Sequence, residues 1–381
     1  MKNITVLGST GSIGAQTLEV LRALPETGRV AALCAKGNGE LLLRQALEFH
    51  PALVCVEEEA VAKEMACALP RGTALITGPE AACAAAAFEG ADTVVNGISG
   101  FAGTKPLLAA LTAGKTVALA NKESIVCAHA LVERAVERGG GTLIPVDSEQ
   151  SALFQCLAAG RREDVKKLIL TASGGPFRTL LKEQLACVTP EMASCHPTWK
   201  MGAKITIDSA TLFNKGLEIM EASYLFGIPG ERIEVLVHPE SMVHSMVEYR
   251  DCSVIAQLSA PDMRLAIHYA LTWPARSQSD FGALDLTKVG KLTFERPDGE
   301  RFPAIPLAYE ALRRGGGAPA VYNGANEAAV ELFRRGEIGF LDIPQLVALA
   351  LSQLAGAGAD SLEELLDTDH QARRLVFGKV R

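Results

Sequence analysis

The sequence has few features of a specialised protein class. No apolar run in its 381 residues is long enough to cross a membrane, and no block of lysine and arginine offers a surface for nucleic acid or anionic lipid. The first residues, MKNITVLGST, lead directly into a strand-like segment without a signal peptide. We therefore expect a cytoplasmic protein that binds neither nucleic acid nor a membrane.

The nine cysteines include no C-x-x-C pair, and the seven histidines show no H-E-x-x-H spacing. These absences argue against a zinc site and a disulfide scaffold, and they indicate reduced, mostly structural thiols. Hydrophobic residues make up 48% and charged residues 21%, with a net charge of -7, which is the balance of an ordinary globular protein. The length predicts two or three domains.

Strand-like and helical segments alternate regularly over residues 1–147. Seven short runs rich in β-branched residues are separated by helical patterns, and these runs are ITVLG, RVAALCA, ALVCV, TALITG, DTVVNGI, KTVALAN and TLIPVD. Alternation of this kind predicts a parallel sheet covered by helices on both faces. We therefore expect an α/β fold whose N-terminal domain, residues 1–147, is a Rossmann-like doubly wound sheet.

The pattern changes after residue 147. One strand (VKKLILTAS), one helix (DSATLFNKGLEIMEASYLFG), two antiparallel strands (MVHSMVEYRDCSVIAQLS) and a further helix (APDMRLAIHYAL) indicate a central α+β domain over residues 148–274. Residues 275–301 are rich in turn residues, as a linker would be. Residues 302–381 contain successive helical patterns and predict a small C-terminal helical bundle.

A glycine-rich turn, GSTGSIG at residues 8–14, follows the first strand and opens the first helix. Glycines let the backbone approach a pyrophosphate, which the N–H groups at a helix N-terminus attract. This predicts a dinucleotide site, although the G-x-x-G-x-x-G spacing departs from the commonest fingerprint and a plain tight turn is the alternative. The second strand ends in Ala35-Lys36-Gly37-Asn38, with one cation and no carboxylate. NADPH is therefore favoured over NADH, unless Lys36 is only a solvated surface residue.

Acidic residues gather at the expected domain junction. Asp147 and Glu149 lie two apart after the last strand, so in an extended segment both carboxylates would face the same side. Such a pair repels itself unless a proton or a metal ion relieves it. The alternative is that Asp147 or Ser148 simply caps the helix that follows. The segment itself favours neither interpretation.

A stripe of polar residues marks the central helix. Asn214, Lys215 and Glu218 fall within about 100° of each other on a 3.6-residue helix, with Asp208 and Ser209 at its predicted start. The hydroxyl, amide and ammonium groups suit a phosphate. The carboxylates, with the junction pair, suit a hard cation such as Mg²⁺ or Mn²⁺ rather than zinc. A solvated helix face is the alternative.

Three further stretches stand at places where ligands bind. Asn121-Lys122-Glu123 and TASGGPF (residues 171–177) each end a strand with polar groups, as at the ligand edge of α/β sheets. HPTWKMG (residues 196–202) places Trp199, one of two tryptophans, between a proline and a glycine. A large apolar side chain is thus located in a turn or loop, where it is not normally buried.

The sequence resembles the 1-deoxy-D-xylulose 5-phosphate reductoisomerase family of the non-mevalonate isoprenoid pathway. The resemblance covers essentially the whole chain and rests on GSTGSIG, ALANKESIV, PVDSEQSA, TASGGPF, HPTWKMG, ITIDSATLFNKGLEIMEA, VHPESMVHSMVEY and QLSAPDMRLAIHYAL. It implies an NADPH-dependent oxidoreductase that rearranges the phosphosugar 1-deoxy-D-xylulose 5-phosphate and reduces the product to 2-C-methyl-D-erythritol 4-phosphate. It also implies a homodimer and a Mg²⁺ or Mn²⁺ ion, with Co²⁺ as a further candidate.

The resemblance assigns roles to individual residues, with residues 1–147 binding NADPH and residues 148–274 binding substrate and metal. The metal ligands would be Asp147, Glu149 and Glu218. These three, with Lys122 and His196, form the expected catalytic group. The substrate would contact Lys122, Ser148, Glu149, Ser173, His196, Ser209, Asn214, Lys215 and Glu218. NADPH would contact Thr10, Gly11, Ser12, Ile13, Lys36, Gly37, Asn38, Asn121, Glu123 and Gly202.

The resemblance also suggests a purpose for HPTWKMG. It implies a flap near residues 194–203 in which Trp199 and Met201 close over the substrate and exclude water. Permanent packing of Trp199 in the core is the alternative. One departure concerns the second strand, where relatives tend to read Ala-Gly-Lys-Asn and this chain reads Ala-Lys-Gly-Asn. The contact of Lys36 and Gly37 with a 2′-phosphate therefore stays open.

Two other functions would fit parts of the sequence. One is a simple NADP-dependent dehydrogenase of a phosphorylated sugar or aldehyde, without isomerisation. The other is a non-catalytic, nucleotide-binding regulatory module in which the acidic residues only cap helices.

Overall fold

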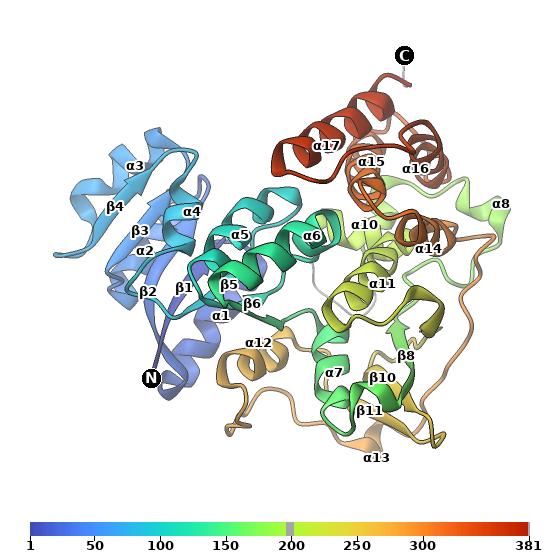
Figure 1. The fold of residues 1–381 in the computed structure, drawn as a ribbon, viewed down its shortest axis with the longest axis horizontal. Coiled ribbons are helices and arrows are strands. Elements are labelled where there is room, and N and C mark those ends of the chain that lie inside the picture. The colour runs from blue at the N-terminus through green and yellow to red at the C-terminus, as the bar shows by residue number, and fades with distance from the viewer. Residues whose placement is uncertain (196–201, 380–381) are drawn as a thin grey trace. The chain divides into compact units, whose positions relative to one another are not determined.

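The computed structural model describes residues 1–195 and 202–379, and the chain divides into two compact units (Figure 1). Unit 1 consists of Met1–Ile125, His129–Ser151 and Asp262–Gly282. Unit 2 consists of Val126–Ala128, Ala152–Pro261 and Ala283–Arg381. Within the described residues, every helix falls short of the length or the apolar character that a membrane span requires.

Unit 1 is built around a seven-stranded sheet with the strand order β4-β3-β2-β1-β5-β6-β7. Every neighbouring pair is parallel. The prediction of a doubly wound sheet is confirmed, because successive strands run outward from β1 in both directions. The strands are β1 (Lys2–Leu7), β2 (Gly28–Ala35), β3 (Leu53–Val56), β4 (Ala74–Thr77), β5 (Thr93–Asn96), β6 (Thr116–Leu119) and β7 (Thr142–Pro145).

Helices cover this sheet, and its strands are accordingly apolar along most of their length. In β2, every residue except Arg29 is buried. The helix predicted from APDMRLAIHYAL returns from late in the sequence and packs against the first helix of this unit. The helices of unit 1 are α1 (Ser12–Ala23), α2 (Gly39–Phe49), α3 (Glu59–Met65), α4 (Ala81–Ala86), α5 (Thr104–Thr112), α6 (Lys122–Gly139, apart from residues 126–128) and α12 (Met263–Thr272).

Unit 2 contains a four-stranded sheet with the order β11-β10-β8-β9. The predicted antiparallel pair is confirmed as β10 (Val243–Tyr249) and β11 (Val254–Leu258). The predicted strand β8 (Val165–Ala172) pairs antiparallel with β10 and parallel with β9 (Ile233–Val237). Strand β9 was not predicted, although IEVLV alternates between buried and half-buried positions as a strand should.

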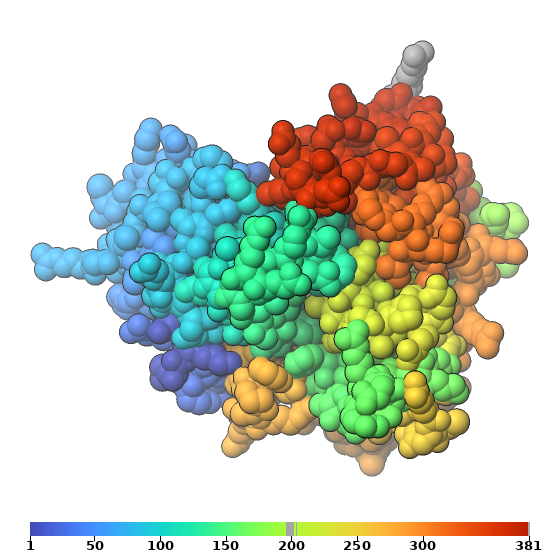
Figure 2. Space-filling view, viewed as in Figure 1, coloured from blue at the N-terminus to red at the C-terminus, as the bar shows by residue number. Residues whose placement is uncertain are grey.

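The predicted C-terminal helical bundle is confirmed. Helices α15 to α17 form a continuous packed surface, coloured orange to red in Figure 2. Inside the bundle, the fully buried Tyr322 donates its hydroxyl hydrogen to the Ala304 carbonyl at 3.0 Å. The bundle helices are α14 (Ala304–Arg314), α15 (Ala318–Arg334), α16 (Asp342–Gln353) and α17 (Leu362–Phe377). The remaining helices are α7 (Ser148–Leu157, which begins in unit 1), α8 (Lys182–Leu185), α9 (Pro190–Ala193) and α13 (Leu286–Val289).

The single central helix expected from the sequence is wrong. The segment forms two helices, α10 (Ala203–Thr211) and α11 (Phe213–Phe226), separated by Leu212 in the left-handed conformation with φ 63°. In the last turn of α10, the Thr211 hydroxyl donates to the Ile207 carbonyl at 2.9 Å, which is local bonding that competes with helix continuation. Asp208 and Ser209 therefore lie near the end of α10 and not at a helix start.

Candidate active site

The glycine-rich turn of unit 1 presents backbone groups at the start of α1. Gly8 has φ 71°, a conformation that glycine adopts without strain. A Cβ at Gly14 would lie 2.3 Å from the Gly8 oxygen, so only glycine fits where the helix presses against the turn. The N-cap residue Gly11 has no side chain to accept the first N–H groups of α1, and the first turn carries no acidic residue. The first N–H groups of α1 belong to Ser12 and Ile13 of the predicted cofactor set and suit a pyrophosphate, while Thr10 and Gly11 of that set lie in the turn before the helix.

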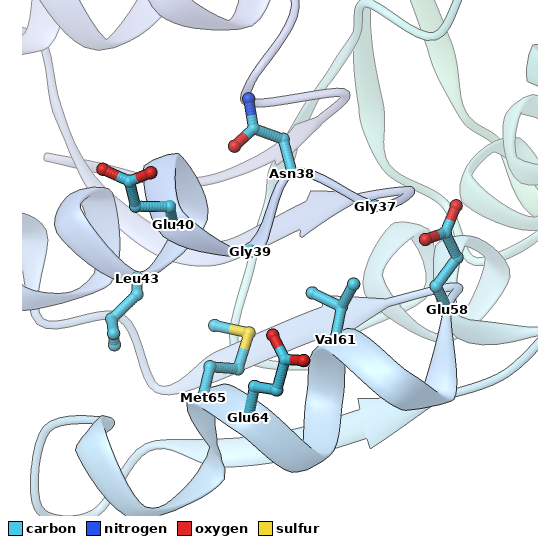
Figure 3. Close-up of a pocket in the computed structure, with 9 residues that line it drawn as sticks. All are labelled: Gly37, Asn38, Gly39, Glu40, Leu43, Glu58, Val61, Glu64 and Met65. Atoms are coloured by element: carbon cyan, nitrogen blue, oxygen red, sulfur yellow. The ribbon is translucent and has the colours of Figure 1, made fainter.

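The turn after β2 forms one wall of an open pocket. Asn38 caps α2 by accepting a hydrogen bond from the Leu41 N–H at 3.2 Å, and Lys36 is exposed. The pocket has a volume of about 660 Å³ (Figure 3). It is lined by Gly37, Asn38, Gly39, Glu40, Leu43, Glu58, Val61, Glu64 and Met65. Lys36, the cation expected to attract a 2′-phosphate, is outside this lining.

The start of α6 and the start of α7 meet through an ion pair. The buried Lys122 lies with its Nζ 2.5 Å from Asp147 Oδ2. Asp147 Oδ1 accepts hydrogen bonds from the Glu149 and Gln150 N–H groups at 3.2 and 3.5 Å. The segment is thus helical from Ser148, and the extended geometry assumed for the acidic pair is wrong. Asp147 does cap the helix, with Oδ1, while its Oδ2 pairs with the Lys122 ammonium group.

Three more predicted residues, Asn121, Glu123 and Ser148, lie in this part of unit 1. The Asn121 amide donates to the Ile98 and Gly100 carbonyls at 2.6 and 2.8 Å, while its oxygen accepts from the Ser124 N–H at 3.0 Å. Asn121 therefore fixes the loop after β5 against α6. Glu123 follows in the first turn of α6 and is half-buried, and the Ser148 hydroxyl donates to Glu149.

In the polar stripe of α11, Lys215 and Glu218 are buried and Asn214 is half-buried, so the alternative of a solvated helix face is wrong. Lys215 and Glu218 are only 4% and 1% exposed and form an ion pair. The Asn214 amide donates to the second oxygen of the same carboxylate. An apolar environment makes a lone charge costly, and this arrangement neutralises the Glu218 carboxylate with donors that could also hold a phosphate.

A loop and a helix end come together in unit 2. Ser173 follows β8, and its hydroxyl accepts a hydrogen bond from the Gly175 N–H at 3.3 Å. Gly174 and Gly175 have φ values of 80° and 68°, and a Cβ at Gly175 would lie 2.7 Å from the Ser209 carbonyl oxygen. The structure thus places the Ser173 loop directly against the end of α10 that carries Ser209.

The helix α10 is held by buried charges that sequence reasoning missed. Asp208, 1% exposed, accepts a hydrogen bond from the Asn326 amide at 2.8 Å and pairs with Lys204 Nζ at 2.8 Å. Lys204 also lies 3.8 Å from Glu327 of α15. We call the set Lys204, Asp208, Asn326, Glu327, Asp369 and Arg373 the α10 anchor.

Arg373 of α17 completes the α10 anchor. Its guanidinium pairs with Glu327 and donates to Asp369 at 2.6 Å. Burial alone would lower the pKa of Arg373, but its hydrogen bond to Asp369 and the charge of Glu327 raise that pKa above its ordinary value. The C-terminal bundle therefore fixes α10 through Asn326 and Glu327, and Arg373 holds Glu327 in place. The signal in the sequence was NGANEA, an unusually polar stretch inside an otherwise apolar helix.

The predicted residues His196, Trp199 and Met201 lie outside the described residues. Gly202 is described as the exposed N-cap of α10.

Three sequence models of one family match the chain. The model of 1-deoxy-D-xylulose 5-phosphate reductoisomerase matches residues 4–129, and the model of the C-terminal domain of that enzyme matches residues 143–226. A model of the DXP reductoisomerase C-terminal domain matches residues 258–375.

Relatives match over nearly their full length. The 1-deoxy-D-xylulose 5-phosphate reductoisomerase of Chlorobaculum tepidum is 52% identical over 374 residues, covering 98% of each chain. The corresponding Chloroherpeton thalassium protein is 48% identical over 381 residues, covering 100% of this chain and 98% of that one.

Solved structures of such enzymes are also similar. The Zymomonas mobilis enzyme in complex with NADPH has a TM-score of 0.94 and 45% identity, covering 100% of this chain and 99% of that one. A DOX-P reductoisomerase in complex with NADPH, fosmidomycin and magnesium has a TM-score of 0.95 and 39% identity, covering 100% and 98%. The family predicted from the motifs is confirmed, and the chain belongs to the 1-deoxy-D-xylulose 5-phosphate reductoisomerase family.

Proposed function

We propose that the protein rearranges 1-deoxy-D-xylulose 5-phosphate and reduces the product to 2-C-methyl-D-erythritol 4-phosphate, using NADPH and a divalent metal ion. The observation that carries the proposal is the buried stripe Asn214, Lys215 and Glu218, which combines phosphate donors with a potential metal ligand. A simple dehydrogenase has no need of such a stripe. In a regulatory module, the buried charges would have no ligand to serve.

NADPH fits the groups present in unit 1. The uncapped N-terminus of α1 suits the pyrophosphate, and residues 36–38 are proposed to hold the adenosine ribose. Asn121, Glu123 and, from unit 2, Gly202 complete the proposed contacts. The solved relatives named above that contain NADPH support this assignment.

A divalent metal fits the donor chemistry of three carboxylates. Asp147 and Glu149 of unit 1 and Glu218 of unit 2 are proposed as its ligands. Oxygen ligands of this kind suit Mg²⁺ or Mn²⁺. Lys122 pairs with Asp147 in unit 1 and Lys215 pairs with Glu218 in unit 2, so two of the three proposed ligands have an ammonium partner that balances their charge.

The substrate phosphate is proposed to bind in unit 2 to Ser173, Ser209, Asn214 and Lys215. The contact between the Ser173 loop and the end of α10 supports the first two. Asn214 and Lys215 both donate to Glu218 in this structure. To serve a phosphate, these donors must turn away from the carboxylate, which then becomes available as a ligand.

The chemistry divides between the bound groups and the chain. When bound, the metal supplies Lewis-acid polarisation and NADPH supplies the hydride. Lys122 and Ser148 are proposed to orient the sugar hydroxyls, and His196 is proposed to contact the substrate. Trp199 and Met201 are proposed to exclude water as parts of a flap near residues 194–203.

Each predicted domain has a role in the proposed function. Residues 1–147 would bind NADPH, residues 148–274 would bind substrate and metal, and residues 275–301 would link them to the helical domain 302–381. A homodimer is supported by the edge strand β11, where Val254 and Ile255 are exposed. A cytoplasmic location is supported by the nine cysteines, all of which are free thiols.

The proposed function is tested by following NADPH oxidation with 1-deoxy-D-xylulose 5-phosphate, with a divalent metal and with a chelator. We expect oxidation to require both the substrate and the metal, and the product to carry the rearranged carbon skeleton. Reduction without rearrangement would favour the simple dehydrogenase. No oxidation under any metal condition would favour the regulatory module.

The Glu218→Gln variant tests the role of the carboxylate. We expect it to abolish turnover while NADPH binding stays near the wild-type Kd, because the change removes a metal ligand and leaves the turn of unit 1 untouched. Glu231→Gln, at an exposed glutamate of unit 2, is the matched control and should keep full activity. Normal activity of Glu218→Gln would contradict the metal assignment.

A further inference from the structure

The pocket beside the β2–α2 turn has an acidic lining at the place where a cofactor phosphate is expected. Its charged residues are three glutamates, with no cation among the lining side chains. Figure 3 shows Asn38 at the start of α2 and Glu58 at the start of α3 on two sides of this pocket. Of these three glutamates, Glu58 is the one whose carboxylate lies against Gly37 in the turn.

Glu58 is at the N-cap position of α3, but its side chain does not cap the helix. It is the N-cap residue of α3, yet its side chain accepts no capping hydrogen bond. A carboxylate at this position normally accepts from the second or third N–H of the helix. The side chain of Glu58 is instead turned toward the loop after β2.

Gly37 makes room for this carboxylate. A Cβ at Gly37 would lie 2.5 to 2.6 Å from Cδ and both oxygens of Glu58. The backbone secures the same contact, because the Glu58 N–H donates to the Lys36 carbonyl at 3.1 Å. A Cβ at Gly39 would likewise lie 2.4 Å from Val61 Cγ1, so the whole turn is pressed against α3. Any residue with a side chain at position 37 would therefore displace the carboxylate.

We propose that Glu58 is a specificity-determining residue that narrows the preference of this protein for NADPH over NADH. The inference rests on the proposed function, in which residues 36–38 hold the adenosine ribose. There, a carboxylate repels a 2′-phosphate and accepts a hydrogen bond from a free 2′-hydroxyl, as the acid at the end of the second strand does in NAD enzymes. Here that strand ends without an acid, and the N-cap residue of α3, Glu58, supplies one across Gly37.

Lys36 acts in the opposite direction. It is exposed at the same turn and attracts the 2′-phosphate through its positive charge. One cation and one carboxylate thus compete at a single phosphate position. The discrimination between the two dinucleotides is the difference between their effects, and it is smaller than Lys36 alone would give.

The experiment measures Kd for NADPH and for NADH by cofactor fluorescence, in the full-length wild type and in Glu58→Gln, at low salt. We expect the variant to bind NADPH about three- to tenfold more tightly, because a charge near a doubly negative phosphate is removed. NADH binding should weaken about two- to threefold, because a charged acceptor is replaced by a neutral one. Raising the salt concentration should shrink the first effect.

Gly37→Ala provides a second variant that keeps the carboxylate in the chain. The backbone at Gly37 is outside the left-handed region, so alanine is accommodated there if Glu58 moves away. We expect this variant to shift the ratio of the two Kd values in the same direction as Glu58→Gln. In protein that already carries Glu58→Gln, adding Gly37→Ala should not change this Kd ratio further. Glu59→Gln, at an exposed glutamate next to Glu58 that does not line the pocket, is the matched control and should leave the ratio unchanged.

The outcomes separate this inference from the proposed function. An unchanged Kd ratio in Glu58→Gln overturns the inference while wild-type binding of NADPH leaves the proposed function standing. A Gly37→Ala effect that persists in the Glu58→Gln background overturns the link between the two residues. Failure of the wild type to bind either dinucleotide overturns the proposed function itself.

Discussion

The glycine-rich turn of unit 1 and the α10 anchor of unit 2 each fix a predicted binding element, but they do so with different groups. The turn uses backbone: Gly8 and Gly14 bring α1 so close that a methyl group on Gly14 would overlap the Gly8 oxygen. The anchor uses buried charges, which run from Asp208 in α10 through α15 to Arg373 in α17. The first is local in the sequence, and the second joins segments far apart.

This difference decides how each region tolerates change. A backbone site has no side chain that can relax, so one added methyl group disturbs the whole turn. A charge network can lose one member and keep its shape, but the partners left behind are buried charges without compensation. We therefore expect a substitution in the turn to reduce NADPH affinity as well as stability. A substitution in the anchor should reduce stability alone.

Gly14→Ala should produce the largest effect of the substitutions that probe this difference. The new Cβ would meet backbone atoms of Gly8 and Ser9 at 2.3 and 2.5 Å. We expect a loss of stability of about 1–3 kcal/mol, since backbone must shift, and a loss of most NADPH affinity. Thermal unfolding and fluorescence titration measure the two effects. Gly356→Ala, where no atom lies within 4 Å, is the control. Wild-type NADPH affinity in Gly14→Ala would contradict the assignment of cofactor binding to the backbone of this turn.

Arg373→Met should have an intermediate effect of the other kind. It removes the cation of Asp369 and leaves Glu327 with only Lys204 at 3.8 Å, so we expect a loss of about 1–3 kcal/mol in the free energy of unfolding. The Kd for NADPH should not change. The adjacent exposed Arg374→Met serves as the control and should stay within about 0.5 kcal/mol of wild type. Equal stability of the two variants would show that the charges of the anchor do not act as a unit.

Glu48→Gln should have the smallest effect, because its ion pair is on the surface. Glu48 accepts from Arg22 at 2.5 and 2.8 Å, but both side chains are about half exposed. We expect the free energy of unfolding to fall by less than about 1 kcal/mol, and by less still in high salt. A larger effect than that of Arg373→Met would contradict the weight given to burial in this comparison.

The effect of Glu48→Gln should also depend on pH in a defined direction. The hydrogen bond from Arg22 holds the pKa of Glu48 below its ordinary value. A depressed carboxyl pKa stabilises the fold above the pKa of the unfolded chain, and this contribution is lost as the pH falls through the folded pKa. The difference between wild type and variant should therefore be present at neutral pH and vanish in acid. Glu40→Gln, at an exposed glutamate 3.8 Å from Arg44, is the control and should show little difference at either pH.

The sequence predicted whatever depends on local patterns. All seven strands of unit 1 were predicted. Most of them are buried and therefore form apolar runs, whereas the mostly exposed edge strand β4 was recognisable from its β-branched residues. The family was recognisable from motifs that span the chain. The turn at Gly8 to Gly14 was also recognisable, because its spacing, strand and helix are contiguous.

Features that depend on distant contacts were not predictable in the same way. The break at Leu212 follows from side-chain bonding within a helix that otherwise has an unbroken apolar pattern. Asp208 was predicted to lie at a ligand site, whereas its partner Asn326 is 118 residues away in the sequence. Glu58 carried no signal either, because its significance depends on the pairing of β2 with β3.

The packing of α12 against α1 has a consequence for biosynthesis. Unit 1 takes its last segment, Asp262–Gly282, from a part of the chain that leaves the ribosome after about half of unit 2 has been made. Helix α1 then lacks its packing partner during most of translation, and the N-terminal unit cannot mature as an independent first product. A nascent chain stalled before residue 262 should accordingly be more susceptible to protease within the first helix than one stalled beyond residue 282.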